Sequence, residues 1–68
     1  MSDQAQVKTN EIRRGLADCR RRLNDAEQAL VAADATAAYR ALTRLRHAAS
    51  DTQSVMEGGG RYVPWEQG

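Results

Sequence analysis

Most of the usual means of stabilising a small protein are missing from this 68-residue chain. It has one cysteine, so no disulfide can form within the chain, and no cysteine and histidine set has zinc-binding spacing. Phenylalanine is absent, and the three aromatic residues are too few for a conventional core. Helix packing, self-association or docking onto a partner must therefore supply the stability.

Long apolar runs are missing as well. No stretch approaches the roughly 18 apolar residues of a membrane span. The start of the chain, Met-Ser-Asp-Gln, lacks the basic and then apolar pattern of a signal peptide. The formal net charge is only +1. We therefore expect a soluble, cytoplasmic protein with no membrane partner.

The residues that are abundant favour helix. Alanine, arginine, leucine, glutamate and glutamine dominate residues 3–57, and the only proline is Pro64. We predict an all-α antiparallel two-helix hairpin over residues 1–57, with helices at about 4–33 and 36–57. The glycines at 58–60 should stop the second helix and act as a hinge for a short aromatic tail, 58–68.

Apolar residues recur with heptad spacing along both segments. We expect this seam to form the core of the hairpin and of a dimer. Its members are Ile12, Leu16, Cys19, Leu23, Ala26, Leu30, Ala38, Leu42, Leu45, Ala49 and Met56. Flanking apolar residues, among them Ala17, Val31, Ala41, Ala48 and Val55, widen the stripe.

The phase of the seam changes between Ala33 and Ala38, where a single long helix would bring arginines onto the seam. A tight turn with Asp34 as N-cap explains the change better. Folding back about Asp34 makes Leu16 meet Thr52. Each helix covers only one side of the apolar stripe of the other. We therefore expect two hairpins to form a four-helix bundle homodimer, or an obligate partner to take the place of the second hairpin.

Few residues could carry out chemistry. Cys19 and His47 are the nucleophile and base to consider, but we expect Cys19 on the seam, as a small apolar residue, and His47 on the opposite, solvated side of its helix. No Glu-x-x-His pair, phosphate-binding loop or paired inward carboxylates occur. We predict neither an enzyme nor a cofactor or metal site.

Arginine supplies nine of the ten basic residues. Folding back places several at one level, where a possible basic belt consists of Arg13, Arg20, Arg21, Arg22 and Arg44. Such a belt would attract a phosphate backbone. Asp18 and Asp25, however, each lie four residues from an arginine, Asp25 from Arg21, which suits intrahelical ion pairs. Three interpretations of these arginines stay open. We favour a solvated face first, a contact with a protein second, and a contact with a nucleic acid third.

Two groups of residues are candidate contacts for a partner protein. On the second helix, a stripe beside the seam consists of Tyr39, Thr43, Arg46 and Ser50; a tyrosine beside an arginine is typical of an interface anchor. Tyr39 could instead cover the dimer seam. In the tail, Tyr62 and Trp65 either dock on the chain's own helices, which we favour, or insert into a partner as secondary anchors.

In its length, its helical hairpin over about 3–57, and Tyr39 and Arg46 on the second helix, the chain resembles small host-takeover proteins of temperate phages, of the quorum-sensing anti-activator type. The resemblance implies a small dimer in the cytoplasm of a bacterial host. Such a protein binds a host transcriptional regulator of the LuxR type, blocks its DNA binding, and in some cases also binds a pilus-assembly ATPase.

Two other resemblances lead to alternative functions. The plasmid RNA-binding regulator Rop is also a dimerising hairpin of about this length, but its RNA-binding face carries an aromatic residue on the first helix, whereas this chain has none before Tyr39. Residues 61–65 are similar in kind to the C-terminus of phage head-completion proteins, without their strand between the helices. We favour a protein-binding inhibitor over a nucleic-acid regulator or a structural virion protein.

Overall fold

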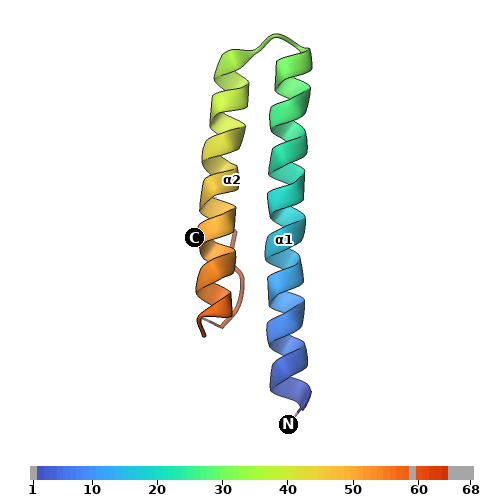
Figure 1. Ribbon diagram of the computed structural model, residues 1–68, viewed down its shortest axis with the longest axis vertical. Coiled ribbons are helices and arrows are strands. Elements are labelled where there is room, and N and C mark those ends of the chain that lie inside the picture. The colour runs from blue at the N-terminus through green and yellow to red at the C-terminus, as the bar shows by residue number, and fades with distance from the viewer. Residues whose placement is uncertain (1, 59, 65–68) are drawn as a thin grey trace.

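The computed structural model describes residues 2–58 and 60–64, with side-chain exposure for 8–58 and 60–64. Two helices, α1 over Ser2–Val31 and α2 over Ala35–Met56, lie side by side and antiparallel (Figure 1). The molecule measures 49 Å by 17 Å by 16 Å. The predicted all-α hairpin is confirmed. Neither described helix is long and apolar enough to cross a membrane.

The turn joins a helix C-cap directly to a helix N-cap. Ala33 has a φ of 57°; its N–H donates to the Leu30 carbonyl at 2.9 Å, and the Asp34 N–H donates to the Ala29 carbonyl at 2.8 Å. This pair of bonds is the Schellman motif. The Asp34 carboxylate then accepts from the Ala37 N–H at 3.0 Å. Asp34 is thus the N-cap of α2, as predicted.

Ala33 occupies a conformation that glycine adopts at lower cost. We expect Ala33→Gly to raise the free energy of unfolding by about 1 kcal/mol. Urea denaturation of the variant and the wild-type protein measures the change. The neighbouring Ala32→Gly is the control, because the Ala32 φ is not positive; an equal gain from both substitutions would contradict the explanation.

The space between the helices is lined by small side chains. Gly15 of α1 lies so close to α2 that a Cβ added to it would be 2.9 Å from the Thr52 Cβ and would overlap the Thr52 hydroxyl. Among residues 8–56, the buried apolar side chains of the two helices are Ala26, Ala38, Ala41, Ala48 and Val55. Small residues let the two backbones approach each other closely, which explains this selection.

This contact lies one position away from the predicted seam. Gly15, not Leu16, meets Thr52, so the predicted pairing is wrong. Of the seam residues, only Ala26 and Ala38 are buried within the hairpin; Ile12, Cys19 and Leu45 are half-buried and Ala49 is exposed. The large members, Leu16, Leu23, Leu30, Leu42 and Met56, are 47% to 67% exposed. Ala41, Ala48 and Val55, expected at the flank, occupy the centre instead.

After α2 the chain folds back toward the helices. Gly58 and Gly60 have φ angles of 109° and 83°, which glycine adopts without strain. They let residues 61–64 return alongside the hairpin (Figure 1). Tyr62 is consequently only 3% exposed. The prediction that the tail docks on the chain's own helices is confirmed for Tyr62, while Trp65 lies outside the described residues.

Candidate functional site

Tyr62 is held at both ends by carboxylates of α1. Its backbone N–H donates to Glu11 Oε1 at 2.7 Å, and its hydroxyl donates to Asp18 Oδ2 at 2.5 Å. Glu11 and Asp18 are seven residues apart, about two helical turns, so they lie on the same side of α1. Both are buried. We call Glu11, Asp18 and Tyr62 the tail clasp.

Arginines of α1 provide further donors to these carboxylates. Arg21 donates to Asp18 Oδ1 at 2.7 Å, and Arg22 Nε lies 3.5 Å from the same oxygen. Arg14 lies 3.3 Å from Glu11 Oε1. Among the described residues, no buried side-chain polar atom lacks a hydrogen-bond partner. The clasp is therefore a satisfied polar network, which makes the tail's position specific.

The clasp shifts the pKa values of its two titrating groups in opposite directions. Burial would raise the pKa of Asp18, but hydrogen bonds from Tyr62 and Arg21 and the charge of Arg22 outweigh burial and lower it below 3.8. Burial, together with the hydrogen bond to the negatively charged Asp18, raises the pKa of Tyr62 above 10. At neutral pH the phenol is therefore neutral and donates to an ionised carboxylate.

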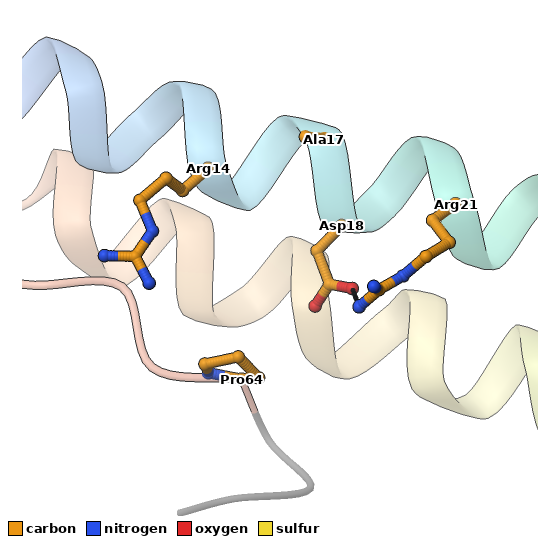
Figure 2. Close-up of a pocket in the computed structure, with 5 residues that line it drawn as sticks. All are labelled: Arg14, Ala17, Asp18, Arg21 and Pro64. Carbon is orange, nitrogen blue, oxygen red and sulfur yellow. Dashed lines mark hydrogen bonds and ion pairs between the residues drawn. The ribbon is translucent and has the colours of Figure 1, made fainter.

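A hollow of about 360 Å³ lies between the tail and α1 (Figure 2). Arg14 and Arg21 extend along its two ends, with Asp18 between them and Pro64 facing them from the tail. Both arginines are already bound to carboxylates of the clasp. The charged side chains that line the hollow are therefore compensated by the carboxylates of the clasp.

The basic belt is likewise partly compensated. Arg21 and Arg22 are bound to Asp18, and Arg22 also lies 4.0 Å from Asp25. The pairing of Asp18 with Arg22, expected from their spacing of four residues, is confirmed, and Asp18 is bound to Arg21 as well. The remaining belt residues, Arg13, Arg20 and Arg44, are exposed.

The predicted contact stripe is open on α2. Tyr39 is 74% exposed, and the hydroxyl of Thr43 donates to the Tyr39 carbonyl at 3.1 Å. Two hollows, of about 280 and 220 Å³, share Tyr39 and Thr43. Arg40 and Arg44 complete the first and Leu42 and Arg46 the second. We call Tyr39, Leu42, Thr43 and Arg46 the Tyr39 surface. Ser50, the fourth residue of the predicted stripe, is exposed but lines neither hollow.

His47 is less exposed, and Cys19 more exposed, than the sequence predicts. His47 is half-buried rather than solvated, and Cys19 is half-buried with a free thiol. Tyr62 faces the helices, and its role as an anchor for a partner stays a prediction. Over 2–58 and 60–64, no group of three or more His, Cys, Asp or Glu residues is placed to hold a metal.

The roles of Glu11, Gly15 and Asp18 could not be predicted from the sequence. The expectation that no paired inward carboxylates occur is wrong, because Glu11 and Asp18 are both buried on one side of α1 and accept hydrogen bonds from Tyr62. A glycine within a strongly helical segment is costly unless something requires it, and this is a signal of close helix contact. Two acidic residues seven apart were a weaker signal, because nothing local connects them with a tyrosine more than 40 residues further along the chain.

Comparison with known proteins assigns no family to this chain: no protein-family model, no curated protein and no solved structure matches it significantly. The fold and the two described surfaces define a helical hairpin with a clasped tail and an exposed tyrosine on its second helix.

Proposed function

We propose that this protein acts by binding another protein through the Tyr39 surface. The observation that carries the proposal is the exposure of Tyr39, 74%, between two hollows. Large aromatic side chains with an apolar body and a polar tip are enriched among the residues that dominate binding energy at interfaces. A partner side chain could enter either hollow and contact the ring.

The neighbours of Tyr39 suit the same role. Leu42 adds apolar area beside the ring, and Arg46 can orient a carboxylate of the partner by a charge-assisted hydrogen bond. The Thr43 hydroxyl already donates to the helix backbone, so it contributes mainly its methyl group. Apolar contact would supply most of the affinity, and the arginine would supply orientation.

For the class of partner, we propose a bacterial transcriptional regulator of the LuxR type, whose DNA binding the protein would block, with a pilus-assembly ATPase as a further target. Support comes from the resemblance to quorum-sensing anti-activators, together with the hairpin fold and the exposure of Tyr39 and Arg46. A nucleic-acid partner is less well supported, because Arg21 and Arg22 are bound to Asp18.

Tyr39→Ala is expected to weaken binding to such a regulator about 30-fold or more, as the loss of an interface anchor does. Gel shifts with a purified LuxR-type regulator on its promoter DNA measure the effect: the wild-type protein should release the DNA and the variant should not. Val31→Ala, a change at another exposed apolar residue, is the matched control and should act like the wild-type protein.

Two results would count against the proposal. If Tyr39→Ala releases DNA as well as the wild-type protein, the Tyr39 surface is not the contact. If the wild-type protein leaves the regulator on DNA and instead binds DNA or RNA itself, with an affinity that falls steeply as salt rises, the nucleic-acid alternative is correct.

A further inference from the structure

Five large apolar side chains of the two helices are about half exposed or more, whereas the buried apolar residues between the helices are alanines and one valine. We call Leu16, Leu23, Leu30, Leu42 and Met56 the leucine face; each is about half exposed or more. Burying a leucine or methionine fully is worth about 1.5–3 kcal/mol. A single hairpin therefore leaves much of its available hydrophobic stabilisation unused.

All five members lie on the same broad side of the hairpin. Leu16 follows Gly15 in the sequence, Leu42 follows Ala41 and Met56 follows Val55; in each pair the first residue is buried and the second is exposed. One position is a rotation of about 100° around a helix. Because the helices are antiparallel, a step of one residue along α1 and a step of one residue along α2 both turn toward the same side of the hairpin. The leucines of α1 therefore lie on the same side as Leu42 and Met56 of α2. Leu23 and Leu30 keep to this side through heptad spacing.

The tail covers the opposite side. Arg14 and Ala17 each precede a buried residue by one position, so they are rotated the other way, and they line the hollow beneath Pro64 (Figure 2). Residues 61–64 therefore pack on the side away from the leucine face. No described segment lies over the leucine face, as the exposure of its members shows.

We propose that the leucine face is the docking surface for a second copy of this chain. The members span residues 16–30 of α1 and 42–56 of α2, about 21 Å along each helix, so a second hairpin related by a twofold axis sets the same apolar strip against itself. Heptad spacing on both helices is the pattern that packs against two further helices of the same spacing, and a second hairpin supplies them. Ile12, Cys19, Leu45 and Ala49, which lie between the members, are uncharged, and Tyr39 and Arg46 border the face on α2.

This inference does not depend on the Tyr39 surface having a partner. Leu42 belongs to both surfaces, so the test changes Leu23, which lies on the other helix. Tyr39 follows the buried Ala38 by one position, as Leu42 follows Ala41, so Tyr39 borders the leucine face and its variant does not serve as a test of the dimer. The dimer is measured by the mass in solution and partner binding by the gel shift, so the failure of one is distinguished from the failure of the other.

Analytical ultracentrifugation provides the first test. The wild-type protein should sediment with twice the 7.5 kDa of one chain, and a single-chain mass would overturn the proposal. Leu23→Glu should raise the dimer dissociation constant at least about 100-fold, because a two-fold interface buries the new carboxylate twice. Val31→Glu introduces the same charge at a residue 83% exposed outside the leucine face, and should leave the constant unchanged.

A second measurement avoids the risk that Leu23→Glu does not fold. A mixture of isotope-labelled and unlabelled wild-type chains should show isotope-filtered NOEs between the methyl groups of Leu16 and Leu23 and protons of the other copy. A dimer without these NOEs, or one that Leu23→Glu leaves at wild-type affinity while folded, would show that another surface associates and would overturn the assignment.

Discussion

Replacing Gly15 with valine is expected to lower the free energy of unfolding by about 3 kcal/mol, near the upper end for overpacked sites. A Cβ at this position would lie 2.9 Å from the Thr52 Cβ and 3.0 Å from its Cγ2. The Thr52 side chain cannot easily turn away, because its hydroxyl donates to the Ala48 carbonyl at 2.7 Å. The helices would have to separate, which would loosen the whole contact. Urea denaturation at a fixed chain concentration measures the loss.

Asn24→Val is the matched control for this prediction. It places the same β-branched residue in the same helix at an exposed position, so it carries the helix-propensity effect without the steric one. We expect it to change stability by less than about 0.5 kcal/mol. If Gly15→Val is as stable as Asn24→Val, the close approach of the helices at Gly15 is contradicted.

Asp18→Ala should lower the free energy of unfolding by about 2–3 kcal/mol, because the buried hydroxyl of Tyr62 loses its acceptor and two arginines lose a buried counter-charge. Tyr62→Phe removes only the hydrogen bond and should cost about 1 kcal/mol. The double variant should cost less than the sum of the two, since both act on one bond. Asp25→Ala, at a half-exposed carboxylate, is the control.

The pH dependence of stability provides an independent check on the tail clasp. Folding lowers the pKa of Asp18, so its contribution is present above 3.8 and is lost as the pH falls through the folded value. Folding raises the pKa of Tyr62, so its contribution is present below about 10 and is lost as the pH rises through the folded value. Thermal unfolding followed by circular dichroism should therefore show an alkaline loss that is smaller in Tyr62→Phe. An identical alkaline loss in that variant would contradict the clasp.

The helical hairpin and the points at which its helices begin and end were predictable, because they depend on local sequence signals. Asp34 has the side chain of an N-cap at the point where the heptad phase changes, and the glycines after Glu57 stop the second helix. Both signals act within a few residues of the chain, so neither depends on the tertiary contacts between the helices.

The identity of the contacting faces could not be predicted from the heptad pattern. That pattern marks where large apolar residues gather, and it led us to pair Leu16 with Thr52. The structure pairs Gly15 with Thr52 and leaves Leu16 half exposed, because the closest contact of two helices needs small residues. In the dimer that we propose, the remaining seam residues would pack against the second copy.

The tail clasp was out of reach for a different reason. Its bonds join Tyr62 to Asp18 and Glu11, residues separated by 44 and 51 positions. The aromatic composition of the tail indicated that Tyr62 packs on the helices. It did not indicate that the buried carboxylates of Glu11 and Asp18 accept hydrogen bonds from Tyr62. The stripe Tyr39, Thr43, Arg46 and Ser50, by contrast, was predicted from helical spacing alone. Its first three members line one hollow together with Leu42, and Ser50 does not. Its role in binding stays a prediction.

The central claim is that the leucine face is completed by another copy of the chain, so that folding and association are coupled. Thermal unfolding of the wild-type protein over a roughly hundredfold range of chain concentration tests it most directly. Coupling predicts a midpoint temperature that rises steadily with concentration. A midpoint that stays the same across the range would show that one hairpin is stable by itself and would contradict the account.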